Sequence, residues 1–226
     1  MALILVGHEA SQSVTKAFRA AGHEAYSCDL KPCSGGCPEW HLQMDVFRAI
    51  QLKRWDMGLF FPDCTFLTAS AEWAYGNPPY HQKVKPETLT GVARWEQRIK
   101  AIIHVLALWH CGINRISIEN PVGVLNTYWR KPSQIIQPYQ FGEDASKKTC
   151  LWLKNLPPLQ STKYVKPRIV DGKRRWSNQT DSGQNNLSPA DNRAELRSKT
   201  YPGIAEAMST QWNPDKLLMF FNYELT

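Results

Sequence analysis

The first half of the chain alternates short apolar runs with segments of helical periodicity. Apolar runs that predict short buried strands lie at residues 3–6, 25–28, 41–45, 57–61 and 115–119. A first helix is predicted between residues 14 and 21, ending at Gly22. A long helix is predicted over 88–110, with an apolar stripe formed by Val92, Trp95, Ile99, Ile102, Ile103, Leu106 and Leu108. This alternation is typical of βαβ units, so we expect an α/β fold with a central, mostly parallel sheet and helices on both faces.

The pattern changes beyond Pro121, where Pro, polar and basic residues dominate to about residue 192. One apolar segment, 150–153, interrupts this stretch, and residues 176–190 hold so few aliphatic side chains that they predict a surface loop. Order is expected to resume over 193–212, with a helix from Ile204 after the Pro202-Gly203 turn. The length and the lack of internal repeats predict one domain, 1–226, with a small basic, Pro-rich insertion at about 154–192.

The composition is that of a globular protein. Of the 226 residues, 42% are hydrophobic and 21% are charged, and the mean hydropathy is −0.43, which excludes disorder of the whole chain. No apolar run approaches the roughly 20 residues that cross a bilayer. Residues 1–6 are too short for a signal peptide and lack its basic flank. We therefore expect a cytoplasmic protein without a membrane partner, in which the six cysteines are reduced thiols.

The charge balance is compatible with a polyanionic partner. Lys and Arg total 27 against 20 Asp and Glu, a formal net charge of +7. Basic residues alternate with Tyr164 and Trp176 inside the insertion, at Lys163, Lys166, Arg168, Lys173, Arg174 and Arg175. Basic side chains neutralise phosphates and aromatic rings stack on bases, so the segment suits weakly specific or single-stranded nucleic acid. An ordinary solvated basic loop explains the same residues.

Reactive side chains follow the predicted strands at nearly every strand end. In open α/β sheets ligands bind beyond the carboxyl ends of the strands. Asp29 follows the second strand, where an acid binds the ribose hydroxyls of nucleoside cofactors. The Gly-x-Gly-x-x-Gly fingerprint and the P-loop are both absent, which disfavours nicotinamide cofactors and ATP. S-adenosylmethionine, a nucleoside cofactor without a pyrophosphate, is the candidate that remains.

Cys64 lies just past the fourth strand in a Pro-flanked turn, where a thiol can be rigid and still open to a ligand. A lone cysteine is more often simply buried. Glu119, however, ends the next predicted strand, and neighbouring strand ends would bring this carboxyl group and the thiol into one crevice.

The order of these motifs resembles that of the C5-cytosine DNA methyltransferases, in particular short, phage-type members. The resemblance rests on Cys64 after a Pro-x step, Glu119-Asn120-Pro121, the upstream Asp29 and Asp45, and Pro202-Gly203-Ile204-Ala205. It implies a Rossmann-like class I S-adenosylmethionine-dependent methyltransferase fold. It also implies that Cys64 attacks C6 of the pyrimidine and that Glu119 binds and protonates its N3 edge while the methyl group passes to C5.

The resemblance also implies the remaining contacts. The cofactor would be bound by Gly7, His8, Glu9 and Ser11 at its methionine part, by Asp29 and Leu30 at the ribose, by Asp45 and Val46 at the adenine, and by Pro62 along the methyl-transfer path. The substrate, duplex or single-stranded DNA, would meet Asp63, Thr65, Asn120, Lys147, Lys148, Arg193 and Arg197. An enzyme of this kind acts in the cytoplasm, including that of a phage host.

Three features depart from the family pattern. Pro62-Asp63-Cys64-Thr65 replaces Pro-Pro-Cys-Gln, and the Asp63 charge should raise the thiol pKa unless it points away. The glycine-rich first motif is reduced to Gly7, and Lys147-Lys148 is the nearest substitute for an arginine pair that backs the target base. These departures leave two alternatives open: modification of a free cytidine or other pyrimidine nucleotide, suggested by the small recognition region, and a catalytically inactive nucleic-acid-binding protein.

Three cysteines and a histidine between residues 28 and 41 do not predict a metal site. Cys28, Cys33, Cys37 and His41 are ligand types for tetrahedral zinc, but their spacing matches none of the usual finger patterns.

Overall fold

The computed structural model describes residues 1–69, 71–81, 83–187 and 198–214. Its strands are β1 (Leu3–Gly7), β2 (Glu24–Asp29), β3 (His41–Gln43), β4 (Met57–Phe60), β5 (Arg115–Pro121), β6 (Gln134–Ile136), β7 (Thr149–Lys154), β8 (Arg168–Val170) and β9 (Lys173–Arg175). Its helices are α1 (Ser13–Ala20), α2 (Val46–Leu52), α3 (Gly91–Trp109), α4 (Leu125–Tyr128) and α6 (Pro202–Gln211), with short 3-10 turns η1 (Pro38–Trp40), η2 (Glu72–Tyr75) and η3 (Pro138–Gln140).

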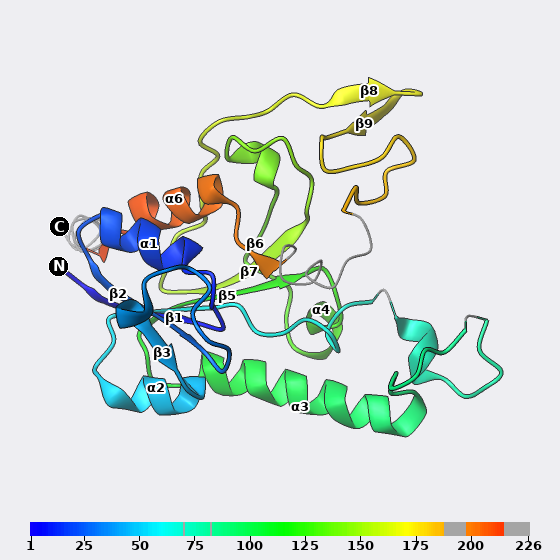
Figure 1. Ribbon diagram of the computed structural model, residues 1–226, viewed down its shortest axis with the longest axis horizontal. Coiled ribbons are helices and arrows are strands. Elements are labelled where there is room, and N and C mark those ends of the chain that lie inside the picture. Colours follow the sequence, from blue (N-terminus) through cyan, green and yellow to red (C-terminus); the bar gives the residue numbers. More distant parts are fainter. Residues whose placement is uncertain (70, 82, 188–197, 215–226) are drawn as a thin grey trace.

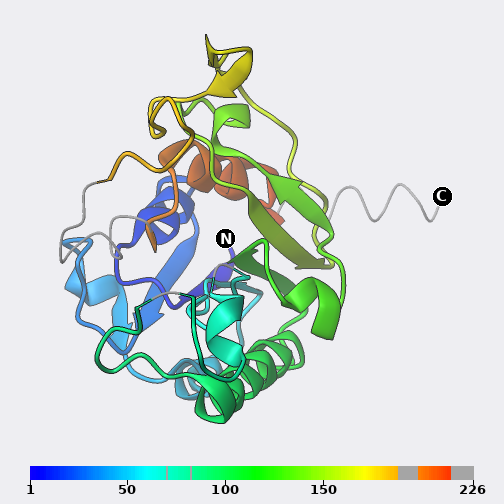
Figure 2. The same cartoon turned by 90° about the vertical axis from the view of Figure 1, so that its right-hand side faces the viewer.

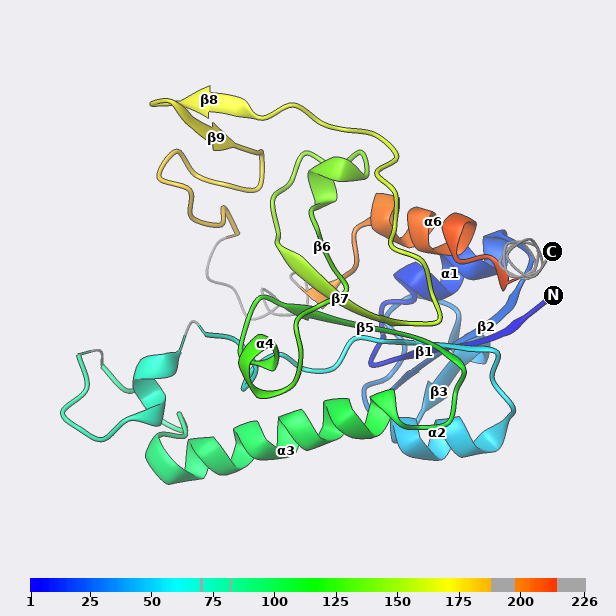
Figure 3. The same ribbon diagram turned by 180° about the vertical axis from the view of Figure 1, so that it is seen from behind.

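Seven strands form one sheet in the order β3-β2-β1-β4-β5-β7-β6 (Figure 1). The first five run parallel, and β7 runs antiparallel to both β5 and β6. Helices α1 and α6 cover one face, and α2 and α3 cover the other (Figures 1 and 3). This strand order, with a single reversed strand inserted beside β5, is that of the class I methyltransferase fold, so the predicted fold class is confirmed.

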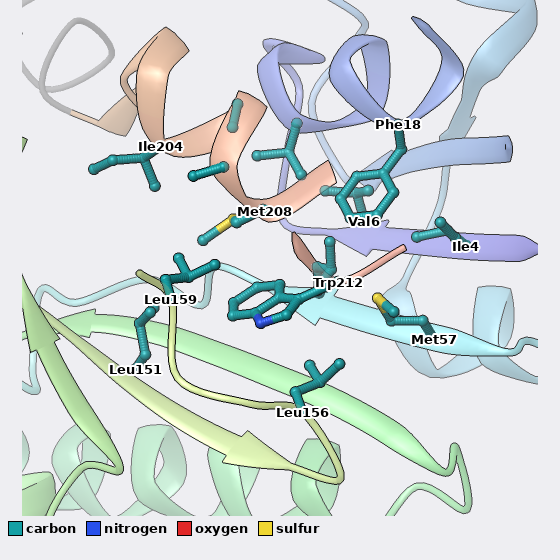
Figure 4. Packing of buried hydrophobic residues seen from close by; sticks show 14 of the residues in the cluster. Ile4, Val6, Phe18, Met57, Leu151, Leu156, Leu159, Ile204, Met208 and Trp212 are labelled. Atoms are coloured by element: carbon teal, nitrogen blue, oxygen red, sulfur yellow. The ribbon is translucent and has the colours of Figure 1, made fainter. Parts of the chain in front are cut away.

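The sheet is buried on both faces, which explains why its strands read as continuous apolar runs. In β1, Ile4 and Val6 pack under α1 and α6, whereas Leu5, between them, joins the core under α2 and α3. Figure 4 shows Phe18, Met208 and Trp212 closing the first of these cores over β1 and β4. Because helices cover both faces, a ligand can reach the sheet at the ends of its strands.

Two element boundaries differ from the prediction because of capping. The third strand ends at Gln43 and not at Asp45, since the Asp45 carboxylate accepts hydrogen bonds from the Phe47 and Arg48 amides and begins α2. The sequence analysis missed this helix. Helix α6 begins at Pro202 and not at Ile204, because proline is well suited to the first helical position.

The apolar stripe predicted for the long helix is buried only in part. Leu108 is buried and Ile102 packs against the core, but Val92, Ile99 and Ile103 are all more than half exposed. The buried face of α3 also carries Arg94 and Arg98, which were not predicted to be buried. Arg98 donates to carbonyls of the loop that follows β4, and Arg94 to the Leu89 carbonyl just before the helix.

The predicted insertion contains a two-stranded hairpin, β8–β9, that projects from the body of the molecule (Figure 2). Strand β7 contains the predicted apolar segment 150–153, whereas β6 and α4 were not predicted. Residues 176–187 form a loop as expected; the remainder of that predicted loop, to residue 190, and the start of the predicted 193–212 segment lie outside the described residues. Within the described residues, no helix is long and apolar enough to span a membrane.

Replacing Trp212 with alanine should destabilise the fold by about 3–5 kcal/mol, the usual cost of removing a buried aromatic side chain. Its side chain is fully buried, and its indole Nε1 donates a hydrogen bond of 2.8 Å to the Pro157 carbonyl. Ile169→Ala, on the exposed hairpin, is the matched control and should change stability by less than about 0.5 kcal/mol. Urea unfolding measures both, and a Trp212→Ala loss below about 1 kcal/mol would contradict this packing.

Candidate active site

A pocket opens at the carboxyl ends of β1 and β2, where the sequence analysis expects the cofactor. It is lined by His8, Glu9, Ala10, Ser11, Asp29, Lys31, Ser34, Phe61, Ser198, Lys199 and Thr200. Four of the nine predicted cofactor residues, His8, Glu9, Ser11 and Asp29, thus share one pocket. Acidic, basic and hydroxyl groups all line this pocket, so it offers partners to a polar ligand.

The turn after β1 keeps a glycine-like backbone although it has lost its glycines. His8 has φ 62° and Gln12 has φ 59°, both in the left-handed region that favours glycine. Gly7 itself is needed for packing, because a Cβ there would lie 2.7 Å from Phe60 Cδ1 and 2.8 Å from Val46 Cγ2. Non-glycine residues in this conformation are concentrated at ligand sites.

The Glu9 carboxylate is hydrogen-bonded to the start of α1. Its carboxylate accepts hydrogen bonds from the Val14 amide at 2.7 Å and from the Thr15 hydroxyl at 2.7 Å, so it caps the start of α1. Burial raises the pKa of this carboxyl, and the bonds from Val14 and Thr15 oppose that rise. Glu9 therefore holds the turn in place, and its contact with a cofactor stays a prediction.

Asp29 lines the pocket, whereas Leu30, Asp45, Val46 and Pro62 do not. Asp29 Oδ1 accepts a hydrogen bond from the Lys31 amide at 2.9 Å. Leu30 is 72% exposed and does not line the pocket, and Val46 is buried beneath Gly7 in the core. Pro62 is buried at the end of β4, and Asp45 caps α2.

A histidine pair stands behind the pocket and was not predicted. His8 Nε2 lies 2.9 Å from His104 Nε2, which comes from α3. Burial, and next the neighbouring His104, lowers the pKa of His8 to about 4, although the charges of Asp29 and Asp45 oppose this shift. His8 is therefore neutral near pH 7. Its Nδ1 is buried and has no hydrogen-bond partner among the described residues.

A second group of side chains gathers at the ends of β4 and β5. These strands pair in parallel, with Phe60 opposite Ile118, so Cys64 and Glu119 leave the same edge of the sheet. Burial raises the pKa of the Cys64 thiol, and the charges of Asp63 and Glu119 raise it further, whereas the Lys147 cation lowers it. Cys64, Glu119 and Lys147 are thus close enough to interact, as the strand-end argument predicts for the first two.

Glu119 is half-buried beneath this edge. Burial raises the pKa of its carboxyl, and the Lys147 cation and a hydrogen bond from Thr149 oppose that rise. Lys147 reaches Glu119 because β7 returns antiparallel along β5, with Thr149 opposite Pro121. The suggested substitute for the family's arginine pair therefore includes one lysine near the site, while Lys148 is exposed and is not among the charges that shift either group.

Three contacts tie the Cys64 loop to the Glu119 loop. Asn120 Nδ2 donates to the Pro62 carbonyl at 2.9 Å, and the Val124 amide donates to the Leu67 carbonyl at 2.9 Å. Thr68 forms a β-bridge with Gly123, where an added Cβ would lie only 2.0 Å from Leu67 O. Asn120 thus has a structural contact beside its predicted role toward substrate.

Asp63 is exposed and its carboxylate faces the chain that follows. Its Oδ1 accepts from the Thr65 amide at 2.9 Å and from the Thr65 hydroxyl at 2.7 Å, which closes the turn around Cys64. The carboxylate thus organises the turn, but its charge still raises the pKa of the thiol. Thr65 is exposed as well.

Several other predicted groups are elsewhere or are not described. Trp176 was expected to stack on bases, but it is buried and its ring stacks on Tyr139 at 4.2 Å, which leaves Tyr164 as the exposed aromatic of that segment. Arg193 and Arg197 lie outside the described residues. Within the described ranges, no group of three His, Cys, Asp or Glu side chains could hold a metal ion. Cys28 donates to the Met44 carbonyl instead, and both ring nitrogens of His41 have hydrogen-bond partners.

No protein-family model and no curated protein sequence matches the chain. Among solved structures it is similar to the Dnmt2 methyltransferase of S. pombe, with 15% identity and a TM-score of 0.42 over 67% of this chain and 48% of that one. It is also similar to a substituted DNMT2 of Spodoptera frugiperda, with 14% identity and a TM-score of 0.42 over 77% and 57% of the two chains. A prophage-encoded E. coli protein assigned as a DNA modification methyltransferase gives 10% identity and a TM-score of 0.42 over 76% and 54%. The chain spans about half the length of these structures.

The charges around Cys64 predict how its reactivity depends on pH. Asp63→Asn removes a negative neighbour of the thiolate, so the pKa of Cys64 should fall and its alkylation should begin at lower pH. Lys147→Met removes the opposing cation, so the pKa should rise. Iodoacetamide labelling of the Cys64 peptide, followed by mass spectrometry across pH, measures both shifts. Lys148→Met is the matched control, and a Lys147→Met profile equal to that of the unmodified chain would contradict the arrangement.

Proposed function

We propose that this protein transfers a methyl group from S-adenosylmethionine to C5 of cytosine in DNA, with Cys64 as the covalent nucleophile and Glu119 as the acid at N3. The observation that carries the proposal is the meeting of Cys64, Glu119 and Lys147 at the carboxyl ends of β4 and β5. This group lies on the same edge of a methyltransferase-type sheet as the polar pocket at β1 and β2. A nucleophile, an acid and a nucleoside pocket at one edge are the parts that the reaction needs.

The residues of the pocket fit a nucleoside cofactor. The Asp29 carboxylate lines it at the end of β2, the position at which an acid binds the two ribose hydroxyls. His8 and Ser11 line the pocket from the turn after β1, and Phe61 lines it from the end of β4. S-adenosylmethionine, when bound, supplies an activated methyl group. Asp29, His8 and Ser11 would hold it.

The proposed role of Cys64 is to activate C5 of cytosine, which is otherwise unreactive. C5 of cytosine becomes nucleophilic only while a thiolate is attached to C6, which is the purpose of covalent catalysis here. Lys147 is the cation that favours the thiolate in a site where burial, Asp63 and Glu119 disfavour it. The Lys147 charge would also stabilise the Cys64 thiolate as it attacks C6.

Glu119 is suited to hold a proton at the pyrimidine edge. Burial raises the pKa of its carboxyl, which favours the protonated form that can donate to N3. In the proposed sequence the Cys64 thiolate bonds to C6 as Glu119 donates its proton to N3, and C5 then accepts the methyl group. The C5 proton is lost to solvent, the bond from Cys64 to C6 breaks, and N3 returns its proton to Glu119.

The basic hairpin supports a polymeric substrate over a free nucleotide. Arg168 and Arg175 already have partners within the protein. Arg168 pairs with Asp181, and both arginines donate to backbone carbonyls of residues 174–181. Lys173 and Arg174 sit at the tip of the projecting hairpin and are exposed. Tyr164, also exposed, lies on the same segment. Cations and an aromatic side chain on a projecting ribbon suit phosphates and unpaired bases.

Cys64→Ser should abolish methyl transfer and leave cofactor binding nearly unchanged, because serine lacks a comparable nucleophile at neutral pH. Isotope-labelled S-adenosylmethionine is incubated separately with duplex DNA, single-stranded DNA and cytidine nucleotides, and nucleosides are analysed by mass spectrometry. Label is expected on C5 of cytosine in a DNA pool. DNA containing 5-fluorocytosine should form a covalent adduct at Cys64.

The half-buried Cys111, at the far end of α3, provides the matched control Cys111→Ser, which should stay active. Label only on nucleotides would make the free nucleotide the substrate. No label in any pool, despite measurable cofactor binding, would indicate a binding protein, and full activity of Cys64→Ser would refute the nucleophile.

Asp29→Ala should weaken binding of S-adenosylmethionine by about 10-fold or more, the usual consequence of losing hydrogen bonds to a charged group. The change in folding stability should be small because Asp29 lies at a strand end. Asp56→Ala is the matched control, since this acid also bonds a backbone amide, that of Leu3, but at the opposite end of the sheet. Isothermal titration calorimetry measures both variants, and an unchanged affinity of Asp29→Ala would remove this residue from the site.

A further inference from the structure

Arg98 is a fully charged side chain in the protein interior. It comes from the middle of α3, and its side chain is only 1% exposed. Burying a guanidinium is unfavourable unless its N–H groups are paired, because the charge loses its hydration. The partners of Arg98 therefore indicate what this burial stabilises.

Those partners belong to the loop that begins at Cys64. Arg98 Nε donates to the Phe66 carbonyl at 2.9 Å, and Nη2 donates to the Thr68 carbonyl at 3.4 Å. The same two residues flank Leu67, whose amide bonds the Cys64 carbonyl at 2.9 Å, as the Thr68 amide does at 3.1 Å. The guanidinium thus holds the turn whose first residue is the proposed nucleophile.

The rest of the guanidinium is held by η2. Glu72 accepts from Nη1 at 3.1 Å and from Nη2 at 2.8 Å, a two-pronged ion pair. The Tyr75 ring lies 3.4 Å from the Arg98 Cζ, and the Tyr75 hydroxyl donates to the same Phe66 carbonyl at 3.1 Å. A planar fork with several fixed donors can make this set of contacts, and a lysine ammonium cannot.

The opposite side of the loop is held by the segment between β5 and α4. Val124 donates to the carbonyl of Leu67, which lies between the two carbonyls that Arg98 binds. Successive carbonyls of the loop are therefore fixed alternately from α3 and from the segment that follows Glu119. Both the distance and the orientation between Cys64 and Glu119 depend on this double attachment.

We infer that Arg98 is a positioning residue that holds the Cys64 loop in register with Glu119, and so sets the geometry of nucleophilic attack. The inference rests on the proposed role of Cys64. It assigns to α3, a helix that contributes no side chain to the pair itself, control over the rate of the covalent step.

The chain offers a matched control one helical turn away. Arg94 is also buried, at 7% exposure, and its Cζ also lies over the Tyr75 ring, at 4.9 Å. Its guanidinium donates to the Leu89 carbonyl at 3.2 Å, outside the Cys64 turn, and it meets that turn only through the Phe66 ring, 5.3 Å from its Cζ. Arg94→Lys therefore repeats the burial and the charge of Arg98→Lys without touching the loop carbonyls.

Arg98→Lys should lower the methyl-transfer kcat by about 10- to 100-fold, the usual effect of a small misplacement of a reacting group. Binding of S-adenosylmethionine should stay within about 2-fold, since the cofactor pocket is on other strands. Iodoacetamide labelling of Cys64 should move in the opposite direction and become faster, because a released loop exposes the half-buried thiol. Arg94→Lys should change neither rate by more than about 3-fold.

The two readouts separate this inference from the proposed function. A faster Cys64 labelling rate in Arg98→Lys, with no methylation by any form of the protein, keeps the positioning role and refutes the methyltransferase. An unchanged labelling rate and an unchanged kcat in a folded Arg98→Lys variant refute the positioning role. If Arg98→Lys does not fold, Glu72→Gln, which keeps the side-chain shape but removes the ion pair, should also lower kcat and speed Cys64 labelling, by smaller factors. If Arg94→Lys changes kcat and the labelling rate as much as Arg98→Lys does, the inference is also overturned.

Discussion

The parallel pairing of β4 with β5 is the constraint on which the candidate site depends. It directs the chain after Phe60 and the chain after Ile118 to one edge of the sheet, so that a thiol and a carboxyl group that are 55 positions apart in sequence meet. The antiparallel return of β7 beside β5 then delivers Lys147 to the same place. A sheet that was parallel throughout would send that segment away from this edge. The single reversed strand is therefore part of the site as well as of the fold.

The electrostatics of the site follow from this crowding. Burial disfavours the charged forms of both Cys64 and Glu119, and the Glu119 charge further disfavours the Cys64 thiolate. One cation, Lys147, opposes both effects. In the proposed reaction, the raised pKa of Glu119 would suit protonation at N3, and the Lys147 cation would favour the Cys64 thiolate. The Asp63 charge disfavours that thiolate, and its hydrogen bonds to Thr65 shape the turn around Cys64.

The sequence was sufficient for β1, β2, β4 and β5 and for the residues that follow them, and insufficient where side chains arrive from helices. Apolar runs mark β1, β2, β4 and β5 because both faces of the sheet are covered, and the rule that ligands lie beyond strand ends then selects Asp29, Cys64 and Glu119. His104 and Arg98 could not be found in this way. Hydrophobic periodicity placed the Ile99 and Ile103 stripe of α3 toward the core, whereas the aromatic and carbonyl-rich loop after β4 draws the arginine face inward. The sequence did hold one signal for the arginine face: Arg94, Arg98, Ala101 and Val105 are spaced so that they share one helical face.

Helix α2 was missed for a simpler reason. Asp45 follows a short apolar segment, and an aspartate in that position can end a strand or serve as the N-cap of a helix equally well.

The turn after β1 has left-handed backbone angles at two residues that are not glycine. Glycine adopts such angles without a steric penalty. Here His8 and Gln12 adopt those angles at some conformational cost, and the surroundings compensate: Glu9 caps α1, the Gln12 side chain bonds Ser27 and the Cys37 carbonyl, and His104 bonds His8. A glycine at position 8 would adopt the same angles without this network, but it would lack the ring that contacts His104. Side-chain contacts therefore fix the backbone of this turn.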